Sequence, residues 1–223
     1  MFSGIIEAVG RIAVRESRGA DVRLQVAAEE LDLSDVRIGD SIAVSGVCLT
    51  VTAMEREGIF HADVSAETLA RTVLGEKPVG AAVNLEKALT LSSRLGGHLV
   101  TGHVDGVGEV VERREAGCSV RFRVRAPDPL AKYIAQKGSI CVDGVSLTVN
   151  RVEGAEFELN IVPHSLQKTT LGEYRPGCRV NLEVDIIARY LERLLLGERA
   201  ASMGSNGVTI EKLAAAGMLK GGP

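Results

Sequence analysis

Apolar and polar residues alternate along short segments that fill most of the chain, and clusters of glycine, aspartate and serine separate these segments. Alternation with a period of two is typical of β-strands that bury one face, and the clusters between them are typical of turns. In the segment 47–51, for example, three aliphatic residues alternate with Cys48 and Thr50. The pattern predicts an all-β fold, and closed barrels would leave no strand edge exposed.

Helical spacing of apolar residues is found near the C-terminus. Charged residues lie between five apolar positions there: Ile187, Tyr190, Leu191, Leu194 and Leu195. We expect an amphipathic helix over 187–201, which could pack on its own barrel or on the same helix of another subunit. Residues 202–223 form a glycine-interrupted tail, with one short helix expected around 210–216, and we assign this tail no role.

Most of the chain consists of two related halves. Blocks of the first half return in the same order in the second half, at offsets of 97 or 98 residues: 4–10 as 102–108, 41–51 as 139–149, 69–76 as 166–173, and 83–86 as 180–183. A repeat of this length exceeds the ~20 to 50 residues of a solenoid unit, so each half should be a complete small domain. We place the two domains at 1–97 and 98–186.

The two copies of the repeated motif present different polar groups. Cys48 and Ser146 occupy the same position, and each is followed two residues later by threonine on the same strand face. That face could line a pocket, although threonine is also common on strand surfaces without a function, which is the favoured interpretation for either copy alone. His103 aligns with Ile5, so the thiol and the imidazole each occur in one copy only.

Composition excludes several classes of protein. The 223 residues are 45% hydrophobic, which is enough for a packed core. A net charge of −3 and 3% aromatic residues disfavour nucleic-acid binding, which needs basic surfaces or stacking platforms. No apolar run approaches the ~20 residues of a membrane span, and no secretory signal is visible, so we expect a cytoplasmic protein.

Cofactor and metal motifs are also missing from the sequence. Neither a dinucleotide fingerprint nor a phosphate-binding loop is present, and no C-x-x-C pair occurs. We therefore expect no structural metal. In a reducing compartment the four cysteines should be free thiols: Cys48, Cys118, Cys141 and Cys178.

Several ordered motifs carry a resemblance to a known family. They are the opening segment 1–6, the pair 46–51 and 144–149, and the segment 96–104. Together with the duplicated layout and the unpaired terminal helix, they resemble the riboflavin synthase alpha chain family over most of the chain. The sequence departs from the family's usual pattern at Ser3, where threonine is common, and this change keeps the hydroxyl.

The resemblance implies a fold, an assembly and a reaction. The fold is a tandem pair of six-stranded Greek-key closed β-barrels followed by a C-terminal α-helix, and the helices associate three subunits into a homotrimer. The reaction is the dismutation of two 6,7-dimethyl-8-ribityllumazine molecules, by four-carbon transfer, to riboflavin and 5-amino-6-ribitylaminouracil. Neither a metal nor an organic cofactor is implied. Each active site is expected between the N-terminal barrel of one subunit and the C-terminal barrel of a neighbour, and an association with lumazine synthase is left open.

The resemblance also implies residue roles. Cys48 is the first candidate nucleophile, against a small buried thiol with a packing role only. His103 could move protons between substrates, against a histidine that only binds the ligand. Ser41 and Asp185 match further polar positions, and Asp185 could orient a ribityl hydroxyl or a water. Lys137 could contact substrate or be an ordinary surface lysine.

The matching positions for substrate contact fall in both halves. In the first half they are Gly4, Ile5, Ile6, Cys48, Leu49, Thr50, Asp63, Val64, Ser65, Ala66, Glu67 and Thr68. In the second half they are Gly102, His103, Val104, Lys137, Ser146, Leu147, Thr148, Val162, Pro163, His164, Ser165, Leu166 and Gln167. Most are small or apolar strand residues, whose backbone groups can pair with the polar edge of the ring.

The sequence leaves two alternatives to the enzyme open. A non-catalytic lumazine- or flavin-binding protein would share this fold, because fold alone does not decide function. The joint presence of Cys48, His103, Ser146 and Thr148 favours the enzyme. A β-barrel interaction module would leave the motifs unexplained.

Overall fold

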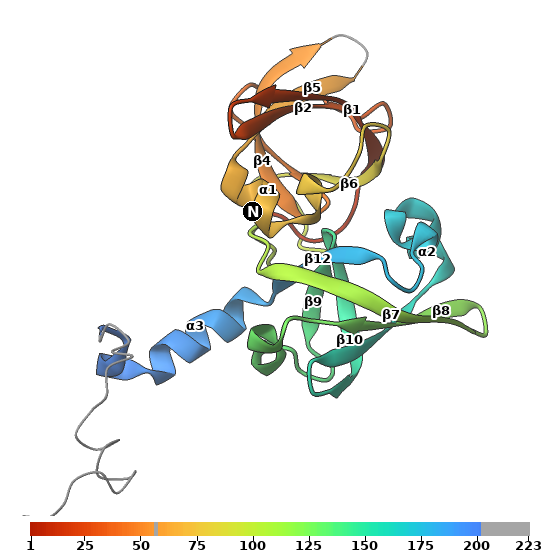
Figure 1. Cartoon of the computed structure of the whole chain (residues 1–223), viewed down its shortest axis with the longest axis vertical. Helices are drawn as coiled ribbons and strands as arrows, with labels where there is room; N and C mark the ends of the chain where they lie inside the picture. The colour runs from red at the N-terminus through yellow and green to blue at the C-terminus, as the bar shows by residue number, and fades with distance from the viewer. Residues whose placement is uncertain (56–57, 202–223) are drawn as a thin grey trace, which may run out of the picture. The chain divides into compact units, whose positions relative to one another are not determined.

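The computed structural model describes residues 1–55 and 58–201 (Figure 1). In the first half, six antiparallel strands close into a barrel in the order β1-β2-β5-β4-β3-β6. The strands are β1 (Ala8–Arg18), β2 (Asp21–Ala27), β3 (Ser41–Val44), β4 (Val47–Glu55), β5 (Ile59–Val64) and β6 (Ala82–Lys87). Between β5 and β6 lie the short helix α1 (Ala66–Arg71) and the 3-10 turn η1 (Val73–Gly75).

The second half repeats this barrel. Around the ring its strands follow the order β7-β8-β11-β10-β9-β12. They are β7 (Gly106–Ala116), β8 (Ser119–Arg125), β9 (Ser139–Val142), β10 (Val145–Glu153), β11 (Glu156–Ile161) and β12 (Arg179–Val184), with η2 (Asp128–Tyr133), α2 (Pro163–Lys168) and η3 (Thr170–Glu173) between them. The register shifts in β4 and β10 fall at the same place in both repeats, so the duplicated barrels expected from the sequence are confirmed in detail.

Each barrel is filled by its own apolar core. In β4, Val47, Leu49 and Val51 point inward and are at most 4% exposed, while Cys48 is half-buried and Thr50 is exposed. The alternation read from the sequence therefore describes the strand correctly. Burying each such side chain contributes about 1.5–3 kcal/mol, and the strand places its polar residues on the outer face as a consequence.

The turns of the two repeated motifs lie back to back. Ser45 and Gly46 have φ of 46° and 78°, and Asp143 and Gly144 have φ of 44° and 85°. Positive φ at both central residues is typical of a type I′ hairpin turn. A Cβ on Gly46 would lie 2.6 Å from the Gly144 nitrogen, so only glycine allows the backbones to approach this closely.

Two asparagines join the barrels beside these turns. Asn84 Nδ2 donates to the Asp143 carbonyl at 2.8 Å, and Asn181 Nδ2 donates to the Ser45 carbonyl at 2.8 Å. Both side chains are 1% exposed, and each also accepts a backbone N–H from the other half. Hydrogen-bonded buried amides of this kind fix the contact between the halves.

The chain preceding each barrel crosses to the other one. We call residues 1–7 the first arm and residues 99–105 the second arm. The two arms pair through Phe2 and Val100, whose amides donate to each other's carbonyls at 2.7 and 3.1 Å. Beyond that pair, each arm contacts a strand of the opposite barrel, so the chain exchanges short segments between its two halves.

The C-terminal segment forms the helix expected from its spacing. Helix α3 (Ile186–Leu195) is followed by the 3-10 turn η4 (Gly197–Ala201). Its apolar residues are exposed, with Tyr190 at 66%, Leu194 at 76% and Leu195 at 82%. The tail expected to carry a short helix at 210–216 lies outside the described residues. In the part of the chain that the structure describes, no helix is both long and apolar enough to cross a membrane.

Candidate active site

Six of the predicted contact residues line one cavity of about 390 Å³. They are Cys48, Glu67, Thr68, Gly102, His103 and Val104, and the cavity wall also includes Val47, Arg71, Thr72 and Asp105. We call these ten residues the first half-site. They come from β4, α1 and the region around it, and the second arm, so segments more than 50 residues apart in sequence meet here. The volume is within the ~300–1,000 Å³ typical of small-molecule sites.

The second arm covers Cys48 closely. The Cys48 amide donates to the Gly102 carbonyl at 2.9 Å. A Cβ on Gly102 would lie 2.6 Å from the Cys48 Cβ, and Gly102 has a φ of 79°, so this position requires glycine for space and for conformation. As a result, the thiol and the exposed side chain of His103 border the same cavity.

The wall of the first half-site formed by α1 is fixed by local hydrogen bonds. Ser65 caps the helix, because its Oγ accepts from the Thr68 amide at 3.2 Å. One turn later, Arg71 Nε lies 2.8 Å from Glu67 Oε1 in an exposed i,i+4 ion pair. The cap and the pair keep Glu67 and Thr68 at the cavity.

Ser146 marks a second half-site at the equivalent place in the other barrel. Its amide donates to the Gly4 carbonyl at 2.7 Å, and Gly4 has a φ of 75°. A Cβ on Gly4 would lie 2.6 Å from the Ser146 Cβ. The first arm therefore covers Ser146 as the second arm covers Cys48, and the second half-site consists of Gly4, His98 and Ser146.

His98 is a site residue that sequence reasoning missed. Its Nδ1 lies 2.7 Å from Ser146 Oγ, and the side chain is 9% exposed. Burial lowers the pKa of His98 below its ordinary value of 6.5, while the charge of Asp185 acts in the opposite direction. Among the described residues, its Nε2 has no hydrogen-bond partner. His98 precedes the segment that is repeated, so comparison of the two halves gave no signal for it.

The remaining first-half positions are spread around the barrel wall. Leu49 and Val64 point into the core and could offer a ligand only their backbone. Asp63 is paired with Arg23, whose Nε lies 2.7 Å from Asp63 Oδ1, and this pairing lowers the pKa of Asp63. Ser41 lies opposite Thr50 on β3 and β4, on the strand pair that carries Cys48. Ala66 opens α1.

The first-arm residues take different positions. Gly4 meets Ser146, while Ile5 is 49% exposed and lines a separate cavity of about 490 Å³. Ile6 packs against the core of the second barrel.

The remaining second-half positions are also dispersed. Lys137 has a φ of 66°, a left-handed conformation that costs a residue other than glycine about 1–2 kcal/mol. Leu147 and Thr148 follow Ser146 on β10, while Val162 precedes α2, which contains Pro163, His164, Ser165, Leu166 and Gln167. Leu166 and Gln167 line a cavity of about 650 Å³ together with residues of β1. Asp185 accepts the Ile187 amide at 3.0 Å and so caps the start of α3.

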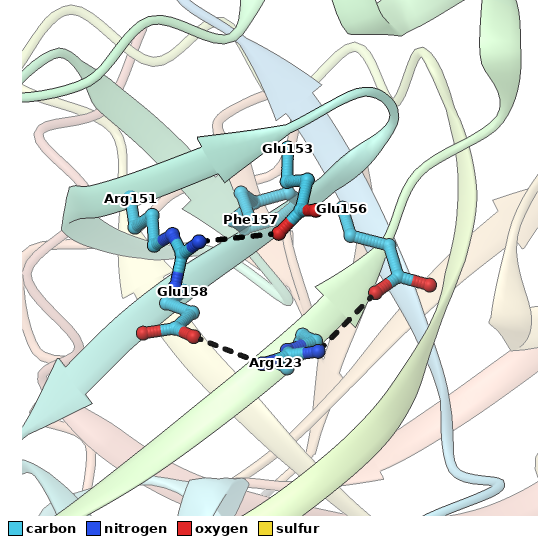
Figure 2. Close-up of a pocket in the computed structure, with 6 residues that line it drawn as sticks. All are labelled: Arg123, Arg151, Glu153, Glu156, Phe157 and Glu158. Atoms are coloured by element: carbon cyan, nitrogen blue, oxygen red, sulfur yellow. Dashed lines mark hydrogen bonds and ion pairs between the residues drawn. The ribbon is translucent and has the colours of Figure 1, made fainter.

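A further, very small depression is formed by ion pairs. Figure 2 shows Arg123 between Glu156 and Glu158, and Arg151 beside Glu153. The space enclosed is about 10 Å³, which is the volume of roughly one water probe. This charged patch on β8, β10 and β11 is therefore a surface ion-pair network and not a ligand site.

Comparison with known proteins assigns the two barrels to a class. Residues 3–88 and 101–185 each match the lumazine binding domain. Riboflavin synthase from Photobacterium phosphoreum is 52% identical over 199 residues, covering 89% of this chain and 91% of that protein. The enzyme of the same name from Photobacterium leiognathi is 46% identical over 211 residues, covering 95% and 96%. The chain therefore belongs to the riboflavin synthase family.

A solved structure shares the architecture with bound ligand. The crystal structure of LumP complexed with 6,7-dimethyl-8-(1'-D-ribityl) lumazine superposes with a TM-score of 0.74 at 25% identity. The match covers 82% of this chain and 99% of that one. The paired barrels described above are thus those of a lumazine-binding fold.

Proposed function

We propose that the two half-sites hold two molecules of 6,7-dimethyl-8-ribityllumazine while one transfers four carbons to the other. The products are riboflavin and 5-amino-6-ribitylaminouracil, as expected for a riboflavin synthase. The observation that carries this proposal is the cavity in which Cys48 and His103 meet, together with the family relationship. Because the atoms of two lumazines equal those of the two products, the reaction consumes no oxidant or reductant.

The inequality of the half-sites suits a reaction between identical molecules. One lumazine must act as donor and the other as acceptor, although both have the same structure. The first half-site offers a thiol and an imidazole, whereas the second offers the Ser146 hydroxyl beside His98. Different polar groups can stabilise different charge distributions, so each barrel would bind its substrate in one role.

Cys48 and His103 are assigned the chemical roles in the first half-site. Loss of a proton from the C7 methyl group of one lumazine gives a stabilised carbanion, and addition of a nucleophile activates the other as acceptor. The His103 imidazole would transfer the proton. The Cys48 thiol would be the nucleophile, or would lie beside another nucleophile that adds to the ring. Holding both rings in register supplies much of the rate enhancement in reactions of this kind.

Other polar residues are proposed to bind the ribityl chain. Ser41 is the first residue of β3, Asp185 follows the last residue of β12, and Lys137 adds a cation. The strained backbone of Lys137 supports a functional role, because such conformations are concentrated at ligand sites. Thr50 and Thr148 are exposed on the strands that carry Cys48 and Ser146, and they add hydroxyls to the two sites.

The test is steady-state kinetics on variants of the first half-site with the lumazine as sole substrate. We expect Cys48→Ser and His103→Gln each to lower kcat, by about 10²–10⁴-fold if the residue takes part in proton transfer or nucleophilic attack. Cys178→Ser is the matched control, because this other half-buried thiol lies away from both half-sites. If Cys48→Ser and His103→Gln both keep the wild-type kcat, as Cys178→Ser is expected to, neither residue takes part in the mechanism.

The assembly is part of the proposal. A homotrimer joined through α3 would cover the exposed apolar residues of that helix, which an isolated chain leaves in water. In such a trimer the N-terminal barrel of one subunit would face the C-terminal barrel of the next. We place the reaction in the cytoplasm, where the substrate could be supplied directly by lumazine synthase.

A lumazine carrier without turnover is the second candidate. The observation that favours it is the similarity to LumP, whose structure holds the lumazine. A carrier would bind the lumazine tightly and leave it unchanged, whereas the proposed enzyme converts it.

A further inference from the structure

Two buried glutamates occupy equivalent positions in the two halves. Glu86 on β6 is 3% exposed, and Glu183 on β12 is 4% exposed. Burying a carboxylate is costly unless several donors satisfy it. Each glutamate is satisfied by the arm of its own half, and this arm then reaches the half-site of the opposite barrel.

Glu183 holds the second arm by three hydrogen bonds. Its Oε1 accepts from the Thr101 amide at 2.6 Å and from Thr101 Oγ1 at 2.8 Å, and its Oε2 accepts from the Gly102 amide at 2.9 Å. Burial raises the pKa of Glu183, and these donors act against that rise by stabilising the anion. Both carboxylate oxygens are therefore used by the two residues before His103.

The contacts continue from the arm into the first half-site. Thr101 Oγ1 donates to Glu183 and accepts from the His103 amide at 3.3 Å. Gly102 is bound on both sides, since its amide donates to Glu183 and its carbonyl accepts from Cys48. A shift of the carboxylate would thus move both the imidazole and the cover over the thiol.

We propose that Glu183 is a positioning residue of the first half-site, whose carboxylate holds the second arm so that His103 and Cys48 face the same cavity. It touches neither substrate nor reacting atoms and acts through Thr101 and Gly102. The inference rests on the function proposed above for the half-site. Its geometric part can be tested without turnover.

The first half of the chain provides a matched control. Glu86 accepts from the Ser3 amide and hydroxyl at 2.6 and 2.8 Å and from the Gly4 amide at 3.0 Å. Its arm covers Ser146 and not Cys48. The same substitution at Glu86 therefore repeats the chemical change at the other half-site.

The experiment compares Glu183→Gln with Glu86→Gln in the full chain. A glutamine has one acceptor oxygen, and its amide group opposes an N–H donor, so one of the arm contacts is lost. In Glu183→Gln we expect iodoacetamide to alkylate Cys48 several-fold faster, with kcat lowered on the order of ten- to a hundredfold and KM changed less. In Glu86→Gln, Cys48 should be alkylated at the wild-type rate. Peptide mapping follows each thiol, and Cys178 serves as an internal control for general unfolding.

A second variant covers the case in which Glu183→Gln does not fold. Thr101→Val keeps the shape of the side chain and removes only the hydroxyl that joins Glu183 to His103. We expect a lower kcat at unchanged melting temperature, while Ser3→Ala removes the equivalent hydroxyl of the first arm and leaves Cys48 alkylation unchanged.

The outcomes separate this inference from the proposed function. If the lumazine chemistry were absent, no variant would turn over, yet the alkylation contrast between the two glutamine variants would persist. Wild-type alkylation of Cys48 in Glu183→Gln, or equal acceleration in Glu86→Gln, would overturn the positioning role. Wild-type kcat in Thr101→Val would also overturn it.

Discussion

The two half-sites differ in a few side chains set on the same backbone. Cys48 and Ser146 take equivalent strand positions under equivalent glycines of the two arms. Around them, His103 stands where the first arm has Ile5, and His98 has no counterpart. The side chains differ in chemical type while the fold is the same, and in the proposed mechanism this difference gives identical ligands different roles.

The buried histidine of the second half-site makes a prediction about pH. Because the folded-state pKa of His98 lies below 6.5, the unfolded chain binds a proton on this side chain at a pH where the folded chain does not. The stability that the neutral histidine contributes is present above pH 6.5 and is lost as the pH falls toward the folded-state pKa. One proton changes the free energy of unfolding by at most about 1.4 kcal/mol per pH unit.

The measurement is urea unfolding at several pH values between about 5 and 8, on the wild-type chain and on His98→Asn. Asparagine can still hydrogen-bond to Ser146 and does not titrate. The wild-type chain should lose more stability than the variant as the pH falls, although it is the more stable of the two at neutral pH. If the free energy of unfolding falls equally with pH in both chains, the pKa of His98 is not lowered by folding.

At the scale of elements, the sequence predicted the strands and the repeat of residues 4–7 as 102–105, but it did not predict which barrel each arm contacts. Alternation of apolar residues identified the repeated strands, because a barrel strand buries every second side chain. The offset between the halves then predicted two equivalent barrels. The arms pair with strands of the opposite barrel, and such contacts leave no periodic pattern. Glu183 lies in the repeated block 180–183, but the repeat alone gave its carboxylate no role. His98 precedes the repeated segments, so the comparison of the two halves gave no signal for it.

The prediction at this scale concerns α3. Its apolar residues are exposed in the single chain, so the proposed trimer should depend on them. A chain ending before Ile187 should become monomeric and lose most of its activity, because the half-sites of neighbouring subunits would no longer meet. The barrels themselves should remain folded, since each has its own core.

Light scattering gives the mass, and circular dichroism reports whether the barrels are intact. A chain ending at residue 201 keeps α3 and is the matched control, which should stay trimeric. A shortened chain that is still trimeric and active would exclude α3 from the assembly.

For the whole molecule, duplication accounts for both stability and function. The two contacting hairpin turns and the hydrogen bonds of Asn84 and Asn181 join the halves. Because each arm contacts the opposite barrel, each half-site depends on both halves of the chain. A separated half would lose the arm that covers its own polar strand. In the proposed mechanism, one chain thus contributes two related but unequal half-sites, one from each lumazine binding domain.

The most direct test is to incubate the purified protein with 6,7-dimethyl-8-ribityllumazine alone and to follow substrate and product together. The proposed dismutation predicts one riboflavin formed for every two lumazines consumed, with no added cofactor. Tight binding of the lumazine without any riboflavin would contradict the enzyme and identify a carrier.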